Sequence, residues 1–302
     1  MSGMEEGKVQ VAALYCFGYI DDLEARRDRL LSMMKTQGVL GTILLAEEGV
    51  NGTICGEPDA IDVVVGQIRR WPAMSELQPK YSWSEDPPFA KARVKIKPEI
   101  VSFGPAVDPQ AKVGEYVDPQ KWDALISQPD VLLIDCRNRY EYNLGTFKGA
   151  VDPQTDSFRE FPDYVKENLN PEKHKKVAMF CTGGIRCEKA TSWMLEQGFE
   201  NVYHLKGGVL NYLQQVPTQN SSWRGECFVF DDRVTVDHDL VPGNYEICPN
   251  CRMPIMPGER DLPEYEENMS CVRCYHRLTP ERRASLAERR KQQRLAAGQV
   301  EQ

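Results

Sequence analysis

One short stretch of the chain brings together residue types that suit thiol chemistry. It reads Cys181-Thr182-Gly183-Gly184-Ile185-Arg186-Cys187 and lies between an apolar strand expected at 176–180 and a helix expected at 187–197. The glycines let backbone amides approach the sulfur of Cys181, while a helix N-terminus and Arg186 add positive charge. All three effects favour the thiolate, so we expect a depressed pKa for Cys181. Such a cradle also suits a persulfide or an oxyanion.

Two alternatives stay open at this loop. Cys181 could simply end a buried strand, with the glycines serving only the turn. The coincidence of strand, turn, glycines, arginine and helix favours the chemical interpretation. Cys187, six residues after Cys181, could resolve an oxidised Cys181 by forming a disulfide. It could equally be a small packing residue on the helix.

A second group of cysteines has the spacing of a metal site. Two Cys-x-x-Cys pairs, Cys248 with Cys251 and Cys271 with Cys274, are separated by 19 residues. Four thiolates at this spacing can surround one Zn²⁺ tetrahedrally, and such a closed site is structural rather than catalytic. His276 is a weaker substitute for one cysteine. The alternative is four free cysteines in a poorly ordered segment.

The elements around residues 181–187, which we call the thiol loop, predict a parallel α/β domain over residues 113–216. Apolar runs at 131–134, 176–180 and 202–205 alternate with helical patterns at 187–197 and 209–215. Asp118 and Pro119 suit the N-cap and first turn of a further helix. This alternation implies a parallel sheet covered by helices on both faces.

A separate α+β domain is expected over residues 8–105. Strands at 9–17, 41–46 and 52–55, helices at 21–37 and 58–70, and a last strand at 93–97 follow in the order β-α-β-β-α-β. This is the ferredoxin-like (acylphosphatase-like) pattern. A Pro- and Gly-containing linker at 106–116 joins it to the parallel domain.

The rest of the chain differs in character. Residues 217–279 carry Pro, Gly and Cys clusters with little periodicity, which predicts a small Cys-rich module held by its metal. Residues 280–302 form a charged tail that is helix-prone to Ala297, with apolar residues too sparse for a core stripe.

Composition sets limits on the class of protein. The 302 residues, 41% hydrophobic and 27% charged, are typical of a globular chain of about two domains. No apolar run approaches the roughly 20 residues that span a bilayer, and the polar start is not a secretory signal. Ten cysteines in metal-type and thiol-type spacings indicate a reducing cytoplasm.

The net charge of −8 argues against general attraction to nucleic acid, but two segments are basic. Lys91, Arg93, Lys95 and Lys97 alternate along one expected strand and could form a basic stripe on one face. Arginines also crowd the tail at 282–294. Either segment could equally be a solvated face.

The thiol loop resembles the active-site loop of the rhodanese superfamily. Asp135-Cys136-Arg137, Glu141 and 145–150 resemble its upstream signature, and Lys206-Gly207-Gly208 resembles its closing segment. The usual Gly-His-Ile is Gly-Thr-Phe here, so the resemblance implies no role for a histidine. Rhodanese-like phosphatases separate Cys and Arg by five residues. Because four separate Cys181 from Arg186, we do not expect phosphatase activity.

A narrower resemblance covers residues 8–280. The segments 46–53, 88–104, 181–189 and 227–231 together resemble the oxygen-dependent tRNA uridine hydroxylases, which make 5-hydroxyuridine at the wobble position. The resemblance implies that Cys181 is the essential, persulfide-type thiol and that Thr182, Gly183, Gly184, Ile185 and Arg186 complete its loop. It implies no known flavin or metal cofactor for the hydroxylation. The sequence adds no dinucleotide fingerprint and no two-His-one-carboxylate cluster among its four histidines.

Three functions follow as hypotheses. The first is a tRNA-modifying oxidoreductase that uses molecular oxygen and an unidentified electron donor on the anticodon region, with the basic stripe holding RNA. The second is a sulfurtransferase that carries a persulfide on Cys181 to a thiol or RNA acceptor. The third is an RNA-binding adaptor, against which the intact loop argues. The oligomeric state is not indicated by the sequence.

Overall fold

The computed structural model describes residues 8–296, with side chains described to residue 292. Residues 1–7 and 297–302 lie outside the described part, and with them most of the polar start and the end of the charged tail. The chain divides into two compact units at Pro242–Gly243. The first unit contains the N-terminal and rhodanese-like domains, and the second contains the cysteine pairs.

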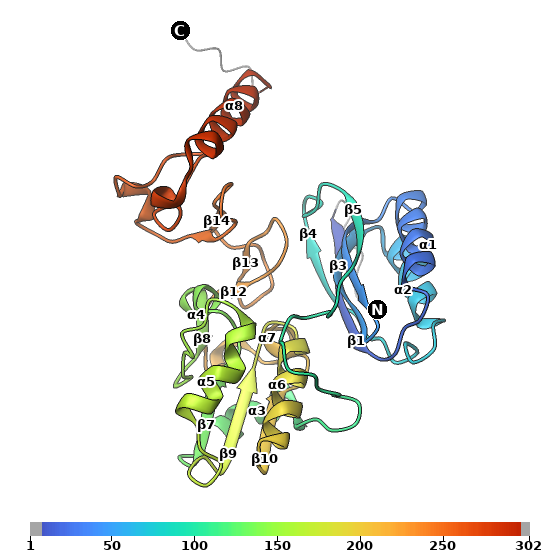
Figure 1. Cartoon of the computed structure of the whole chain (residues 1–302), viewed down its shortest axis with the longest axis vertical. Helices are drawn as coiled ribbons and strands as arrows, with labels where there is room; N and C mark the ends of the chain where they lie inside the picture. The colour runs from blue at the N-terminus through green and yellow to red at the C-terminus, as the bar shows by residue number, and fades with distance from the viewer. Residues whose placement is uncertain (1–7, 297–302) are drawn as a thin grey trace. The chain divides into compact units, whose positions relative to one another are not determined.

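The N-terminal domain is a five-stranded sheet with two helices on one face (Figure 1). Its sheet order is β4-β1-β3-β2-β5, in which β5 runs parallel to β2 and the other neighbours are antiparallel. The elements are β1 (Val9–Phe17), α1 (Leu23–Thr36), β2 (Leu40–Ala46), β3 (Gly49–Gly56), α2 (Pro58–Arg69), β4 (Lys80–Ser84) and β5 (Ala92–Ile96).

This confirms the ferredoxin-like pattern and corrects one of its strands. The strand expected at 93–97 is not the fourth ferredoxin-like strand but an additional edge strand, β5. The fourth strand is β4, which pairs with β1 and was not predicted. Its residues, Lys-Tyr-Ser-Trp-Ser, are mostly half-buried, so they lack the apolar alternation that marks a strand in sequence.

The two faces of this sheet have different roles. Residues such as Leu14, Ile43 and Ile54 face α1 and α2 and form the domain core. Because side chains alternate along a strand, their neighbours Tyr15 and Thr42 point to the opposite face, which no helix of the domain covers. Part of this open face contacts the rhodanese-like domain, since Tyr15 bonds to Glu188 and Lys80 bonds to Gly183.

The rhodanese-like domain has a four-stranded parallel sheet in the order β6-β10-β9-β7. Helices α5 and α6 cover one face, and α3 and α7 cover the other (Figure 1). The elements are β6 (Glu115–Val117), α3 (Pro119–Ile126), β7 (Val131–Asp135), α4 (Arg139–Leu144), β8 (Gly145–Phe147), α5 (Phe161–Asn168), β9 (Lys176–Phe180), α6 (Ile185–Glu196), β10 (Asn201–Leu205) and α7 (Gly208–Gln215), with short 3-10 helices at Phe158–Glu160 and Thr218–Asn220.

The parallel sheet covered on both faces confirms the expected architecture, with local differences. Asp118 precedes α3 as expected, but its side chain does not cap the helix and instead lies 3.3 Å from the amine of Lys206. The short elements β6, α4 and α5 were not predicted, because a few residues give too little periodicity to recognise.

Residues 217–242 do not belong with the cysteine pairs, contrary to the expected module boundary at 217. β11 (Trp223–Gly225) pairs with β8, and β12 (Cys227–Phe228) pairs with β13 (Thr235–Val236). Their apolar side chains Trp223, Cys227 and Val236 join the core beneath α3 and α7. Burial of these side chains therefore attaches the segment to the rhodanese-like domain.

The second unit has little regular structure apart from one helix. It contains β14 (Glu246–Ile247), β15 (Pro254–Ile255), 3-10 helices at Glu259–Asp261 and Tyr275–Arg277, and α8 (Pro280–Ala296). Its small core consists of Ile255 and the cysteines, with Tyr265 packed against them. α8 confirms the expected helix over most of its length, and Leu286 within it is buried.

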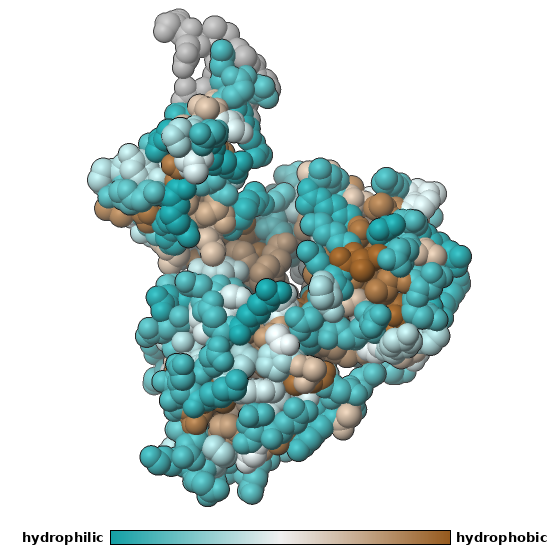
Figure 2. All heavy atoms as spheres, in the orientation of Figure 1, coloured by the Kyte–Doolittle hydropathy of each residue, from teal (hydrophilic) through white to brown (hydrophobic). Residues whose placement is uncertain are grey.

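Hydrophilic residues cover most of the visible face of the first unit, with an apolar patch on the N-terminal domain (Figure 2). None of the helices within residues 8–296 is long and apolar enough to cross a membrane. Phe230 is one of the few large apolar side chains left exposed, at 59%.

Candidate functional site

Cys181 lies at the carboxyl end of β9, an inner strand of the parallel sheet, and its side chain is fully buried. The chain turns through Thr182, Gly183 and Gly184 before α6 begins at Ile185, two residues earlier than expected. Gly184 has φ +104°, and a Cβ there would lie 2.7 Å from the hydroxyl of Tyr15. This turn therefore requires glycine for its conformation and for a close contact with the N-terminal domain.

The surroundings of Cys181 stabilise its negative form. The amide of Gly184 donates a hydrogen bond to its Sγ over 3.2 Å. Burial alone raises the pKa of Cys181, but the Cys187 thiol, the charge of Arg186 and the backbone amides of Cys187 and Gly184 outweigh it and lower the pKa to about 5. The residues of the loop thus hold a buried thiolate near neutral pH.

Arg186 is itself held by a buried carboxylate. Its guanidinium makes two hydrogen bonds with Glu141, of 2.6 and 2.7 Å. The hydroxyl of Thr182 donates to the same carboxylate over 3.1 Å, and Glu141 also accepts from the amide of Asn138. The bidentate geometry fixes the guanidinium beside the loop. Both terminal nitrogens of Arg186 therefore already donate hydrogen bonds to Glu141, which disfavours phosphate binding by this residue.

Three buried thiols meet at this point. Cys187, in the first turn of α6, contacts both Cys181 and Cys136, which follows β7. Burial, followed by its contacts with these two cysteines, raises the pKa of Cys187 well above its usual value. Cys187 therefore stays a thiol and can donate to the Cys181 thiolate. This contact is compatible with both the resolving role and the packing role.

The N-terminal domain contributes side chains to the same loop. The amine of Lys80 donates to the carbonyl of Gly183 over 2.9 Å and lies 4.9 Å from the centre of the Tyr15 ring. The Tyr15 hydroxyl donates to Glu188 of α6 over 2.7 Å. Burial raises the pKa of Glu188, and hydrogen bonds from Tyr15 and Tyr116 oppose that shift. The thiol loop is thus built by two domains.

A cavity of about 660 Å³ lies against the outer side of the loop. Residues of the loop form part of its wall, the open face of the N-terminal sheet forms another part, and the 228–233 turn contributes Phe230. Representative lining residues are Tyr15, Thr42, Lys97, Thr182, Arg186 and Phe230. Its size falls in the range of small-molecule sites, about 300–1,000 Å³. Cys181 is not among the lining residues, because its sulfur is buried behind the loop.

The basic stripe lies on the face that lines this cavity. Lys91, Arg93, Lys95 and Lys97 are all exposed. Arg93 pairs with Thr42 and Lys95 with Leu44 across β5 and β2, and both partners line the cavity. Because directly paired residues share a face, the stripe continues the cavity wall along the edge of the sheet.

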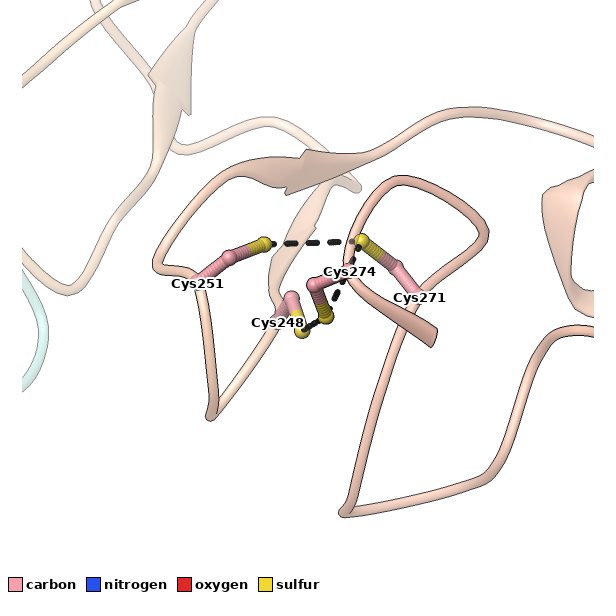
Figure 3. Close-up of side chains that lie close together, drawn as sticks. All are labelled: Cys248, Cys251, Cys271 and Cys274. Carbon is pink, nitrogen blue, oxygen red and sulfur yellow. Dashed lines mark hydrogen bonds between the residues drawn. The ribbon is translucent and has the colours of Figure 1, made fainter. Parts of the chain in front are cut away.

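The four cysteines of the second unit converge (Figure 3). Their sulfur atoms all lie within 4.8 Å of one another, with Cys248 and Cys274 3.7 Å apart and Cys251 and Cys271 3.5 Å apart. Four sulfurs at the Zn–S distance of about 2.3 Å would be about 3.8 Å apart in a tetrahedron. The cluster therefore fits a tetrahedral metal ion. His276 is not part of it.

The basic tail is partly neutralised within its own unit. Arg283 pairs with Glu266, and Arg290 lies 3.8 Å from Glu267. Arg282 donates a hydrogen bond to the side chain of Asn250, which lies between Cys248 and Cys251. These contacts attach α8 to the module, which favours a structural role for the paired arginines over RNA contact.

Sequence reasoning missed four residues that shape the site. Glu141 was noted only as part of a signature, although its place three residues after Asn138 is a capping-box signal. Lys80 and Tyr15 gave no signal, because their roles depend on packing between domains. Phe230 lay in a quoted segment, but its exposure was not evident from sequence.

We expect Glu141→Gln to lower the free energy of unfolding by about 3–5 kcal/mol, since it leaves the buried charge of Arg186 unpaired. Burial raises the pKa of Glu141, but the charge of Arg186 outweighs this and lowers it. A lowered carboxyl pKa stabilises the fold at neutral pH, and this contribution is lost as pH falls through the folded-state pKa. Urea unfolding at several pH values should therefore show a full deficit at pH 7 that shrinks below about pH 4.

The matched control is Glu172→Gln, which removes an exposed carboxylate paired with Lys175 and should change stability little. A Glu141→Gln protein as stable as wild type at pH 7 would contradict the role given to this pair.

Comparisons with known proteins agree with the two domains of the first unit. Residues 9–100 match the UPF0176 acylphosphatase like domain, and residues 118–215 match the Rhodanese-like domain. Among solved structures, the Rhodanese-like domain of an Anabaena sp. protein is 21% identical and covers 36% of this chain and 78% of its own, with a TM-score of 0.30. A Staphylococcus aureus rhodanese-like domain protein is 18% identical and covers 32% of this chain and 90% of its own, with a TM-score of 0.28.

A curated relative matches almost the whole chain. The tRNA uridine(34) hydroxylase of Teredinibacter turnerae (strain ATCC 39867 / T7901) is 51% identical over 288 residues, which cover 95% of this chain and 90% of the relative. Identity at this level over nearly the full length includes both domains and the second unit's cysteine segment. The chain belongs to the tRNA uridine(34) hydroxylase family.

Proposed function

We propose that this protein hydroxylates C5 of the wobble uridine of tRNA, with Cys181 as the essential thiol. The observation that carries the proposal is the stabilised thiolate of Cys181 behind the wall of a nucleoside-sized cavity. The 51% identical relative that is named for this reaction supports it. All ten cysteines lie within the described residues and none is in a disulfide. This supports a location in the reducing cytoplasm.

The cavity has the features that a single unstacked base needs. RNA-modifying enzymes commonly extrude the target base and hold it by stacking and hydrogen bonds. Phe230, exposed in the cavity wall, lies 5.8 Å from the guanidinium of Arg186. Its turn is fixed by the bidentate contact of Arg233 with Asp231. We infer that the uracil ring stacks on Phe230, with the anticodon backbone along Arg93, Lys95 and Lys97.

The burial of Cys181 restricts how it can take part. Its sulfur is separated from the cavity by the Thr182–Gly184 turn. The base therefore reaches Cys181 when this turn opens, or meets an atom carried on the sulfur, such as the outer sulfur of a persulfide. The amide of Gly184 and the charge of Arg186 stabilise either anionic form.

The stoichiometry of the reaction sets a further requirement. Hydroxylation by molecular oxygen replaces the C5 hydrogen of uracil with a hydroxyl group and reduces the second oxygen atom to water. This consumes two electrons and two protons in addition to O₂. In the proposal an external donor supplies the electrons, and the loop supplies the anionic sulfur.

The cysteine cluster of the second unit is proposed to hold Zn²⁺. Cys248, Cys251, Cys271 and Cys274 would be its four ligands, which leaves no open position for substrate. The ion would supply folding energy to a unit whose core is otherwise small.

A sulfurtransferase is the second candidate, since the same cradle would stabilise a Cys181 persulfide awaiting a thiol or RNA acceptor. The N-terminal domain and the cavity favour the hydroxylase over sulfur transfer to a small thiol, because a small acceptor needs neither. A thiosulfate:cyanide assay separates the two candidates.

We expect tRNA from cells that lack this protein to lose 5-hydroxyuridine and its derivatives, in a strain with no parallel pathway. Wild type should restore them and Cys181→Ala should not, because the reacting sulfur is gone. Cys55→Ala, which removes a buried cysteine of the N-terminal domain, should restore them like wild type. The readout is mass spectrometry of digested tRNA. Unchanged nucleosides in the deletion strain would rule out hydroxylation and leave the sulfurtransferase.

Lys95→Ala and Arg93→Ala should each weaken tRNA binding and reduce the slope of log affinity against log salt by about 1, as expected for the loss of one phosphate contact. Binding would be measured by fluorescence anisotropy at several salt concentrations. Lys121→Ala, which removes an exposed lysine of α3, should leave the slope unchanged. Equal slopes for all variants would mean that the stripe is only a solvated face.

Metal analysis should give about one Zn²⁺ per chain for wild type, and Cys271→Ser should lose most of it. Chelation should then expose residues 243–296 to limited proteolysis while the first unit stays resistant, because the metal holds only the second unit. Cys16→Ser serves as the control and should retain the metal. A metal-free wild type with the same protease resistance would show that the cysteines do not bind a structural ion.

A further inference from the structure

Both polar groups of the peptide between Gly183 and Gly184 make hydrogen bonds, one to Cys181 and one to Lys80. Its N–H, which belongs to Gly184, points to the sulfur of Cys181 over 3.2 Å. Its C=O, which belongs to Gly183, accepts from the amine of Lys80 over 2.9 Å. The two groups of a trans peptide point in opposite directions. A hydrogen bond that fixes the carbonyl therefore also fixes the amide.

This peptide needs such a restraint because it joins two glycines. Glycine residues rotate with little steric cost, so the peptide between them can flip readily. A Cβ placed on Gly183 would meet nothing within 4 Å, so no neighbouring atom restrains the Gly183 side of the peptide at that position. The flipped arrangement would turn a carbonyl oxygen toward the sulfur, which repels a thiolate.

We propose that Lys80 is a positioning residue that locks the Gly183–Gly184 peptide with its amide toward Cys181. Lys80 is the first residue of β4, on the open face of the N-terminal sheet opposite Ala13. The N-terminal domain therefore completes the thiolate cradle in addition to lining the cavity.

Other charged groups around Cys181 come from several elements, and the test must separate Lys80 from them. Arg186, Cys187 and Glu188 lie on α6, Glu141 lies on α4, Cys136 follows β7, and Tyr15 and Tyr116 come from β1 and β6. Burial lowers the pKa of Lys80 to about 8, while Cys181 and Glu188 oppose this shift. Lys80 is therefore mostly protonated at neutral pH. Removing its positive charge would by itself make the Cys181 thiolate less stable, even if the peptide kept its orientation.

The first measurement is the amide resonance of Gly184 by ¹H–¹⁵N NMR on the full chain. In wild type it should move strongly as Cys181 ionises, and in Lys80→Met this response should be lost. Lys80→Gln keeps a donor without the charge and should retain part of the response, and Lys80→Arg should retain more. Lys35→Met, on the exposed end of α1, should behave like wild type.

The second measurement is the thiolate fraction at pH 5 from ultraviolet absorbance, taken as the difference from a Cys181→Ser partner in each background. For a pKa that rises by one, Lys80→Met should lower this fraction about fivefold. Equal losses in Lys80→Met and Lys80→Gln, with an unchanged Gly184 response in both, would assign Lys80 a charge effect only and overturn the proposal. These readouts do not use tRNA, so they remain decisive if hydroxylation is disproved.

Discussion

A negatively charged sulfur buried in a protein needs hydrogen-bond donors or positive charge beside it. The first unit is built around this requirement. Cys181 is fully buried, and its ionised form is stabilised by the Gly184 amide, the Cys187 thiol and the charge of Arg186. Arg186 is buried as well, so it requires Glu141, which in turn is held by Thr182 and the start of α4. Each charge is therefore acceptable only because the next is present, which makes the site a network rather than one reactive residue.

The two domains of the first unit share this network and the cavity beside it. The open face of the N-terminal sheet supplies Tyr15 and the basic stripe, while the rhodanese-like loop supplies the thiolate. A further junction, in which Lys189 lies 2.8 Å from both Glu48 and Glu99, fixes the start of the connecting segment to α6. Because these contacts join residues far apart in the chain, the geometry of the site depends on how the domains dock.

Much of the fold and the chemical part of the site could be predicted, because their signals are local. The thiol loop and the cysteine pairs are contiguous motifs, and the main helices and strands show clear periodicity. What was missed depends on contacts distant in sequence. Lys80 meets Gly183 across 103 residues and Glu141 meets Arg186 across 45, and neither pair has a local signature. Similarly, β4 can be recognised only from its pairing with β1. Residues 223–236 were assigned to the wrong unit because their short apolar run does not show which core it packs into, and only the folded structure places it in the rhodanese-like core.

The central claim is that the protein holds Cys181 as a thiolate. It is tested most directly by ¹³C NMR of the chain labelled at cysteine Cβ, with the Cys181 signal identified by its absence in Cys181→Ser. The account predicts a thiolate chemical shift at pH 7 and a single titration with its midpoint near pH 5, in line with the pKa of about 5. A thiol shift at pH 7, with a midpoint above about pH 8 as for an ordinary cysteine, would contradict it.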